Sequence, residues 1–260
     1  MKEHRLRRIF ATDQKTVIVA CDHGGFSGPL SGLEDPGKLM DILVSSGVDA
    51  VLTTIGIARR FADRMGKMGL ILRMDGGSSN RAVEMGTLRN QVSLEDAVRL
   101  GADAVICMGM IGYREESASL VNLADLVSQS SIWNIPVVAE MLVAAREGSK
   151  RTPEDLAFAM RIGVEAGADI IKTAYAGPPD QYREALRSCY RPVVVLGGEK
   201  TKTEAEFFES ISEALDSGAN GVAIGRNVWQ HTNPGGICRA LVALVHQGVS
   251  VSQALKELNS

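Results

Sequence analysis

The sequence predicts a (β/α)8 TIM barrel, a closed parallel sheet of eight strands surrounded by helices. Four segments share one pattern, in which a glycine ends a helix, a short polar turn follows and an apolar strand begins. Four further apolar runs complete a series of eight strands that alternate with amphipathic stretches, and eight is the strand number of a closed β/α barrel. The patterned segments are 47–52, 101–106, 167–171 and 218–224, and the further runs are 16–21, 70–74, 137–141 and 193–196.

Length and composition agree with one barrel domain over residues 1–260. The chain has 260 residues, and a typical barrel has about 250. Hydrophobic residues make up 45% of the chain, which is enough for a sizeable core. No linker, charge block or low-complexity tract divides it. An open doubly wound sheet would show the same alternation, but the strand count and the length favour the barrel.

Charge, hydropathy and cysteine spacing limit the possible partners. The formal net charge of −3 and the pI near 5.9 give no basic surface for nucleic acid. No apolar run is long enough to cross a membrane, and no apolar signal core follows the basic N-terminus. The cysteines are scattered without metal-like spacing, which is typical of reduced thiols in the cytosol. We therefore expect a cytoplasmic protein without a metal. The cysteines are Cys21, Cys107, Cys189 and Cys238.

Lys172 is the strongest candidate for a catalytic residue. It lies late in the apolar run 166–175, which reads as a buried strand. Charged side chains are rarely fully buried without a partner. A desolvated lysine loses basicity and can attack a ketone to form a Schiff base. The structural alternative is a lysine that pairs with a carboxylate or reaches solvent.

Two carboxylates are expected to lie close to this lysine. In a barrel, the catalytic groups come from the carboxyl ends of the strands. Strand alternation puts Asp22 on the same face as Ile18 and Ala20, and Glu140 on the face of Val138. If these faces point inward, both carboxylates meet the amine and can transfer its protons. The nearby lysine charge would keep Glu140 ionised as a base, while burial would raise its pKa toward the working range. Either residue could instead cap a loop or pair with an arginine.

The last two strand ends predict a phosphate-binding site. Gly197 and Gly198 allow backbone N–H groups to approach an anion without obstruction by side chains. Gly225 and Arg226 follow the eighth strand, where barrels commonly bind phosphate at a short extra helix. Arg226 would add a charge-assisted contact to the phosphate. A Gly-Gly pair alone is usually only a turn, so the argument depends on the two adjacent strand ends together.

Helix starts are expected just beyond both of these strand ends. Thr203 and Glu206 form a capping-box pattern that places a helix start after the seventh strand. Residues 227–230 could form the short extra helix after the eighth strand. Asn233 and Pro234 then open the final helix. Both strand ends would thus present helix N-termini to an anion.

The motifs resemble those of the class I aldolases of the DeoC/LacD superfamily, in particular its DhnA-type branch. This branch includes the archaeal-type fructose-bisphosphate aldolases, 2-amino-3,7-dideoxy-D-threo-hept-6-ulosonate synthase and the thiolase that processes phosphorylated autoinducer-2 breakdown products. The resemblance covers nearly the whole chain. It is strongest in residues 8–10, 22–24, 167–172, 197–200 (including Lys200) and 221–230.

The resemblance implies a role for each of these motifs. Lys172 matches the Schiff-base lysine of the family, and Asp22 matches a catalytic carboxylate. The family fold is the β/α barrel, and its members often assemble as pentamers or decamers, which implies a homo-oligomer. The positions that match the substrate-phosphate site are Gly197, Gly198, Gly225 and Arg226.

The resemblance breaks after the fifth strand. The archaeal-type aldolases and the heptulosonate synthase carry a catalytic tyrosine there, whereas this chain has Leu142 and Val143. Leucine cannot transfer a proton, so the resemblance does not imply cleavage of fructose bisphosphate. Glu140 is the available substitute. Residues 22–34 instead resemble the thiolase branch, in which a histidine after the aspartate takes part, and this makes His23 a candidate, although an isolated histidine is more often structural.

The sequence therefore predicts a class I aldolase that makes or breaks a carbon–carbon bond in a small phosphorylated ketose or keto compound through a Lys172 imine. No cofactor is expected, because the Schiff base supplies the electron sink that class II aldolases obtain from zinc. The enzymatic alternative is thiolase-like transfer from a phosphorylated diketone to coenzyme A, which would then be a co-substrate. The alternative of another class is a barrel that binds a sugar phosphate without turnover. The polar stretch 75–91 is either a lid or an inert insertion.

Overall fold

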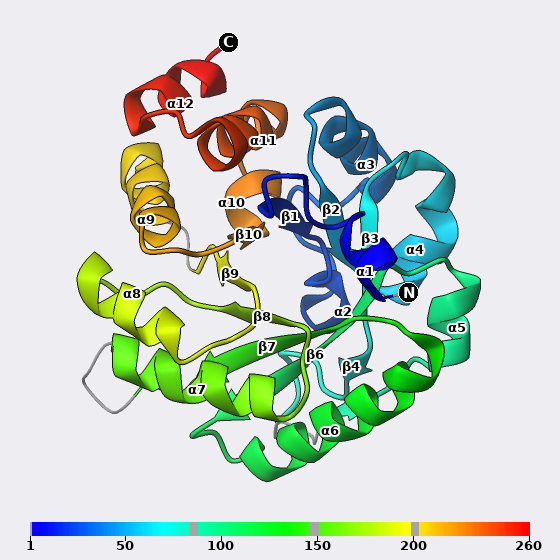
Figure 1. Ribbon diagram of the computed structural model, residues 1–260. Coiled ribbons are helices and arrows are strands. Elements are labelled where there is room, and N and C mark those ends of the chain that lie inside the picture. Colours follow the sequence, from blue (N-terminus) through cyan, green and yellow to red (C-terminus); the bar gives the residue numbers. More distant parts are fainter. Residues whose placement is uncertain (1, 84–87, 146–150, 199–202) are drawn as a thin grey trace.

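The computed structural model describes residues 2–83, 88–145, 151–198 and 203–260, so Lys200 of the predicted phosphate loop lies outside the described residues. Eight parallel strands close into a barrel in the order β1-β10-β9-β8-β7-β6-β3-β2, with helices around it (Figure 1). Each of the eight predicted strands is present, which confirms the predicted barrel. The strands are β1 (Thr16–Ala20), β2 (Ala50–Thr53), β3 (Gly69–Arg73), β6 (Ala104–Ile111), β7 (Val137–Val143), β8 (Ile170–Thr173), β9 (Val193–Leu196) and β10 (Gly221–Ile224).

The outer layer consists of helices that follow the strands and pack on the outside of the sheet. Several begin at a side-chain cap; for example, Thr152 accepts from the backbone N–H of Asp155, whose side chain accepts from the backbone N–H of Thr152 in return. In the described part of the chain, none of the helices combines the length and the apolar character that a membrane span needs. The principal helices are α3 (Pro36–Ser45), α4 (Ile55–Phe61), α5 (Leu94–Arg99), α6 (Glu116–Trp133), α7 (Pro153–Glu165), α8 (Pro179–Arg187), α9 (Glu204–Asp216) and α11 (Pro234–Val242).

Shorter elements complete the chain. The extra helix α10 (Arg226–Trp229) follows β10 as predicted, and α11 begins after its Asn233 cap. The helix α11 is not the final one, which corrects the expectation: the π-helical turn η2 (Ala243–Gln247) and helix α12 (Val251–Leu258) follow it. The remaining short elements are α1 (Lys2–Leu6), α2 (Gly24–Ser27) and the 3-10 turn η1 (Ala62–Arg64).

Strand alternation divides the core into two parts. An outer cluster lies between the sheet and the helices, and a separate inner cluster fills the barrel. The inner cluster contains Ile18 and Ala20 of β1, Ile71 of β3, Val138 of β7 and Ile170 of β8. Residues two positions further along each strand therefore face the same interior, at the carboxyl ends of the strands.

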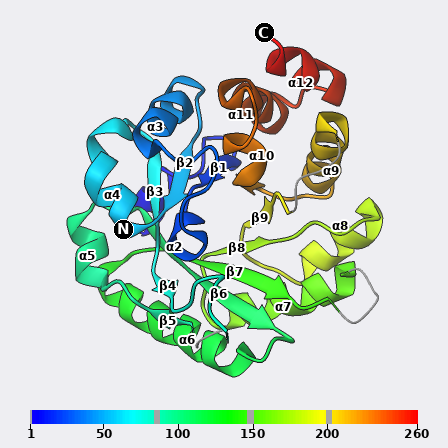
Figure 2. The ribbon, with the colours of Figure 1, turned by 180° about the vertical axis from the view of Figure 1, so that it is seen from behind.

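The segment before β1 closes the other end of the barrel. Ile9 is fully buried within the inner cluster. Lys2 Nζ lies 2.7 Å from Asp169 Oδ2, and Arg8 Nε lies 2.9 Å from Asp103 Oδ1. Figure 1 views the barrel from the side on which α1 lies, and Figure 2 shows the opposite side, where α2 and β4 lie. The open mouth is therefore the end at which the strands terminate.

The polar stretch after β3 has a fixed base. Asp75 and Gly76 form strand β4 (Asp75–Gly76), which pairs in antiparallel fashion with β5 (Arg89–Asn90). The backbone N–H of Gln91 donates to the carbonyl of Met74 over 2.7 Å. The ends of this insertion are thus tied to the barrel, while its residues 84–87 lie outside the described ranges.

Candidate active site

A cavity of about 190 Å³ opens at the carboxyl ends of the strands. Its wall combines charged side chains that rise from inside the barrel, apolar side chains and glycine backbone. The predicted site residues Asp22, His23, Glu140 and Lys172 all line it, as do the four predicted phosphate-binding residues. The complete lining is Ala20, Asp22, His23, Phe26, Arg73, Met108, Glu140, Leu142, Lys172, Leu196, Gly197, Gly198, Ala223, Gly225 and Arg226.

Lys172 lies within reach of a carboxylate at the centre of this cavity. It follows Ile170 of the inner cluster at an alternating position on β8, and it is 5% exposed. The register of β7 and β8 sets Lys172 directly beside Glu140. The Nζ atom of Lys172 lies 2.5 Å from Glu140 Oε1. The structure thus brings the predicted amine and one predicted carboxylate into contact, in a place that water hardly reaches.

Arg73 is a charged residue of this site that the sequence analysis missed. It lies at the end of β3, two residues after Ile71 of the inner cluster, and it is 8% exposed. Its Nε donates to Asp22 Oδ2 over 2.8 Å, and its Nη2 donates to Glu140 Oε2. The same alternation that selected Asp22 and Glu140 applies to residues 71 and 73, so the signal was present in the sequence.

Asp75 is a second residue that the sequence analysis missed. It accepts from Arg73 Nη1 over 3.1 Å and from the backbone N–H of Met108 over 2.9 Å. Asp75 is 8% exposed and begins the β4 strand. Asp75, at the start of the insertion after β3, therefore links Arg73 to the backbone of β6 beside the cavity.

The charges around Glu140 and Asp22 keep both carboxylates ionised. Burial by itself raises the pKa of Glu140, but the charges of Lys172 and Arg73 outweigh burial and lower it. The expectation that burial would raise this pKa toward the working range is therefore wrong, because the charge of Lys172, with that of Arg73 added to it, outweighs burial. The pKa of Asp22 is also lowered, since the charge of Arg73 and the contact with His23 outweigh the effect of burial.

His23 lies beside Asp22 at the edge of the cavity. Its Nδ1 is 3.4 Å from Asp22 Oδ1, and among the described residues this buried nitrogen has no hydrogen-bond partner of good geometry. The imidazole ring packs edge-on against Trp229, with 5.4 Å between the ring centroids. His23 is thus held close to Asp22 by packing, without a hydrogen bond of good geometry from the described residues to fix its ring nitrogen.

The predicted phosphate loops lie next to each other on one side of the cavity. Arg226 Nη2 donates to the carbonyl of Gly198 over 3.1 Å, and Asn227 Nδ2 donates to the carbonyl of Gly197 over 3.1 Å. The N-terminus of α10 follows Gly225, and an exposed Arg226 begins that helix. Backbone N–H groups at a helix start, together with a guanidinium, form a surface suited to an anion.

The predicted cap beyond β9 is present. The Thr203 hydroxyl accepts from the backbone N–H of Glu206 over 3.2 Å, and α9 begins at Glu204. Among the described residues, no group of three or more His, Cys, Asp or Glu side chains is placed to hold a metal ion.

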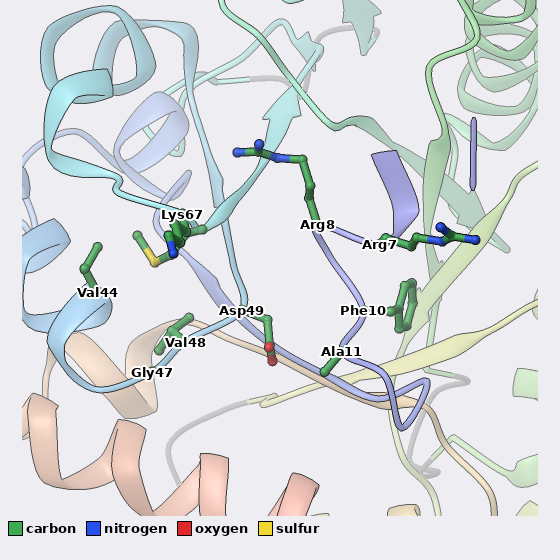
Figure 3. Close-up of a pocket in the computed structure, with 10 residues that line it drawn as sticks. Arg7, Arg8, Phe10, Ala11, Val44, Gly47, Val48, Asp49 and Lys67 are labelled. Atoms are coloured by element: carbon green, nitrogen blue, oxygen red, sulfur yellow. The ribbon is translucent and has the colours of Figure 1, made fainter. Parts of the chain in front are cut away.

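A larger cavity of about 660 Å³ lies at the opposite end of the barrel, among segments that precede the strands. Arg7, Arg8 and Lys67 line it, but the two guanidinium groups point in different directions (Figure 3). Arg8 is already paired with Asp103. Because its polar groups do not converge on one point, this cavity lacks the arrangement that marks the mouth as the candidate active site.

Comparisons with known proteins point to one family. The profile of the DeoC/LacD family aldolases matches residues 16–231. The chain is 34% identical to the 2-amino-3,7-dideoxy-D-threo-hept-6-ulosonate synthase of Halobacterium salinarum, with 98% of this chain and 95% of the relative covered. It is 33% identical to the 3-hydroxy-5-phosphonooxypentane-2,4-dione thiolase of Enterobacter sp., with 98% and 84% covered.

A solved structure shows the same relationship in three dimensions. It is an archaeal fructose-1,6-bisphosphate aldolase with its catalytic lysine bound covalently to the carbinolamine intermediate of the substrate. The structures superpose with a TM-score of 0.85 at 32% identity, over 94% of this chain and 99% of that one. With a matching family profile over most of its length, this chain belongs to the DeoC/LacD family of aldolases.

Proposed function

We propose that this protein is a class I aldolase that acts on a small phosphorylated ketose or keto compound through an imine on Lys172. The observation that carries the proposal is the contact between Lys172 Nζ and Glu140 Oε1, 2.5 Å apart in the mouth of the barrel. An amine becomes a nucleophile only after it gives up a proton, and Glu140 is an ionised acceptor beside it. The archaeal relative with a lysine-bound carbinolamine supports this chemistry.

The proposed reaction follows from these positions. Lys172 transfers its proton to Glu140, and the neutral amine attacks the substrate carbonyl to give a carbinolamine, which loses water to form an iminium. A carboxylate then takes the proton from the hydroxyl on the carbon that will leave. The electrons of the breaking carbon–carbon bond move to the iminium, an aldehyde departs and an enamine remains. Protonation and hydrolysis of the enamine release the second product and restore the amine.

The substrate phosphate is proposed to bind between the Gly197-Gly198 loop and the start of α10. Arg226 and the backbone N–H groups near Gly225 would hold it by charge-assisted hydrogen bonds. The carboxylates lie deeper in the barrel and would repel an anion. This arrangement supports a substrate whose phosphate stays near the rim while its carbonyl reaches Lys172.

A second candidate activity is acyl transfer from a phosphorylated diketone to coenzyme A. Leu142 lines the cavity just after the carboxylate of β7, so a tyrosine hydroxyl is not available at this position. The Enterobacter relative is named as a thiolase of a phosphonooxy-dione, which supports this alternative. Coenzyme A dependence separates the two activities, whereas a barrel that binds the phosphate without turnover would show neither.

Borohydride trapping tests the proposal. The protein is incubated with a panel of phosphorylated ketoses and diketones, reduced with borohydride and digested, and the peptides are read by mass spectrometry. The expected result is a reduced adduct on the peptide that contains Lys172 for one or more compounds. An enzyme that turns over a panel compound without forming any adduct would contradict the imine chemistry, and turnover that requires coenzyme A would favour the thiolase.

We further propose a homo-oligomer in the cytoplasm. Large apolar side chains lie exposed on the outer helices, with Val121 and Ile132 on one face of α6 and Phe158 on the adjacent α7. The family resemblance implies a pentamer or decamer. Light scattering coupled to size-exclusion chromatography measures the assembly, and Ile132→Glu is expected to shift it toward the monomer. A wild-type protein that elutes as a monomer would contradict this part of the proposal.

A further inference from the structure

Arg73 makes three contacts that no assigned role explains. Its guanidinium lies inside the barrel, 8% exposed, and its three nitrogen atoms donate to three carboxylates, with Nη2 also 2.8 Å from Asp22 Oδ2. Those carboxylates come from three separate elements: Asp22 after β1, Asp75 on β4 and Glu140 on β7. A buried cation needs compensation by opposite charge, but one carboxylate would be enough for that. The triple contact indicates a more specific purpose.

Asp75 fixes the direction of the guanidinium. One oxygen of Asp75 accepts from Arg73 Nη1 over 3.1 Å, and the other accepts from the backbone of Met108 on β6 over 2.9 Å. Since the guanidinium is planar and rigid, holding Nη1 also fixes the directions of Nε and Nη2. These two remaining nitrogens meet Asp22 and Glu140.

Glu140 is shared between Arg73 and Lys172 through its two oxygens. Oε2 accepts from Arg73, and Oε1 lies 2.5 Å from Lys172 Nζ. Arg73 therefore orients the free oxygen of Glu140 toward the amine. When Lys172 loses its charge during imine formation, its ion pair with Glu140 ends, whereas the guanidinium stays protonated and keeps its contact.

We propose that Arg73 is the positioning residue of this site, which keeps the carboxyl groups of Glu140 and Asp22 oriented throughout the cycle of Lys172 and favours their ionised, proton-accepting form before each transfer. This inference rests on the proposed Schiff-base function. The charge of Arg73 is among the causes that lower the pKa of both carboxylates, in line with such a role. Among the described residues, the carboxylates that face Arg73 are those of Glu140, Asp22 and Asp75. The thiol of Cys107, whose pKa burial raises, lies near it, and Lys172 and His23 lie beside Glu140 and Asp22.

The first test measures the titration of the two carboxyl groups directly and needs no substrate. The full-length wild type and Arg73→Gln are labelled with ¹³C at the Asp and Glu carboxyl carbons, and their signals are followed by NMR as the pH changes. Asp22→Asn and Glu140→Gln assign the two signals. In Arg73→Gln, both groups are expected to titrate about one pH unit higher or more. Unchanged titration of both groups in a folded variant would overturn the proposal.

The second test reads function with the panel compound that forms the Lys172 adduct. In Arg73→Gln, turnover is expected to fall by roughly 100-fold, and the acid side of the pH–rate profile moves to higher pH, while borohydride still traps the imine at high pH. Arg73→Lys keeps the charge but offers one nitrogen in place of three. We expect the acid side of its pH–rate profile to lie at the same pH as in the wild type, because the charge is kept. Its turnover should be at least about 10-fold lower than that of the wild type.

Controls separate this inference from the function on which it rests. Arg8→Gln removes an arginine–carboxylate pair at the closed end of the barrel, and we expect it to leave the pH–rate profile unchanged. If Arg73→Gln does not fold, Arg73→Lys tests the positioning role in its place. Turnover at the wild-type rate in Arg73→Lys would overturn that role. Failure of the wild type to form any adduct contradicts the aldolase instead, and the NMR titration still tests Arg73.

Discussion

The indole Nε1 of Trp229 donates a hydrogen bond to the backbone carbonyl of Ala20 over 3.0 Å. The two residues are 209 positions apart in the chain, and their bond fastens α10 to the end of β1. It thereby brings the proposed phosphate site next to the segment that carries Asp22 and His23. The close approach leaves little room at Gly225, which lies between these elements.

Replacing Gly225 is expected to damage the site. A Cβ atom there would lie 2.7 Å from His23 Cε1 and 2.9 Å from the carbonyl oxygen of Ala20, so Gly225→Ala must push the two elements apart. We expect a lower melting temperature and weaker binding of phosphorylated substrates. Gly24→Ala is the matched control, because no atom lies within 4 Å of the added methyl group. Equal behaviour of the two variants would contradict the close contact.

Lys172→Arg is expected to fold and to lose turnover. A guanidinium can still pair with Glu140, but it stays protonated and cannot attack a carbonyl. Circular dichroism checks the fold, and borohydride trapping followed by mass spectrometry checks for the adduct. An adduct on Lys200 or Lys202 in the wild-type protein would move the nucleophile to a different loop.

Arg226→Ala is expected to weaken binding of the phosphate selectively. A charge-assisted hydrogen bond contributes roughly 1.5–3 kcal/mol, so KM for the phosphorylated substrate should rise about 10-fold or more. The dephosphorylated analogue serves as the control, and its KM should change little. If KM rises equally for both compounds, Arg226 acts through its contact with Gly198 and not through the phosphate.

Glu140→Gln is expected to separate imine formation from bond cleavage. The amide keeps the shape of the side chain but accepts no proton, so cleavage should fall by roughly 100-fold or more while trapping on Lys172 persists at high pH. Single-turnover kinetics measure the cleavage step. Cleavage at the wild-type rate would assign the proton transfer to Asp22 or His23 instead.

His246 is expected to make stability depend on pH. Its hydrogen bond to Asp49 raises its pKa, burial opposes this, and its hydrogen bond to Asp13 adds to the rise. A raised pKa stabilises the folded state fully below the unfolded value of about 6.5, and this stabilisation is lost as the pH rises through the folded value. His246→Gln should therefore lower the melting temperature more at pH 6 than at pH 9. A pH-independent difference would show that the ion pairs contribute nothing.

The sequence was sufficient for the strands and for three of the central side chains. Period-two alternation correctly grouped Asp22 and Glu140 with inward apolar residues, and the place of Lys172 late in a buried strand identified the amine. The last helix was missed although its signal was present: Ser250 and Gln253 form a capping box at the start of α12.

The hydrogen-bond and ion-pair partners of the buried side chains were harder to predict than the face of the strand on which each side chain lies. Alternation would also have placed Arg73 inside, but it could not have given its contacts with Asp22 and Glu140, which link residues 51 and 67 positions apart. Distances of that kind depend on the closure and register of the whole barrel, which no local pattern encodes. The predicted direction of the Glu140 pKa shift was wrong because the sequence does not show whether the charges of Lys172 and Arg73 together outweigh burial.

The segment before β1, residues 2–15, closes one end of the barrel, so the two ends of the barrel have different roles. Ile9 fills the closed end, and the Lys2–Asp169 and Arg8–Asp103 pairs fasten the segment to the loops around it. These residues lie at the opposite end of the strands from Lys172. Substitutions in this segment should therefore change how well the protein withstands heat, whereas substitutions at the mouth change what it does, so each end can be re-engineered with the other left as it is.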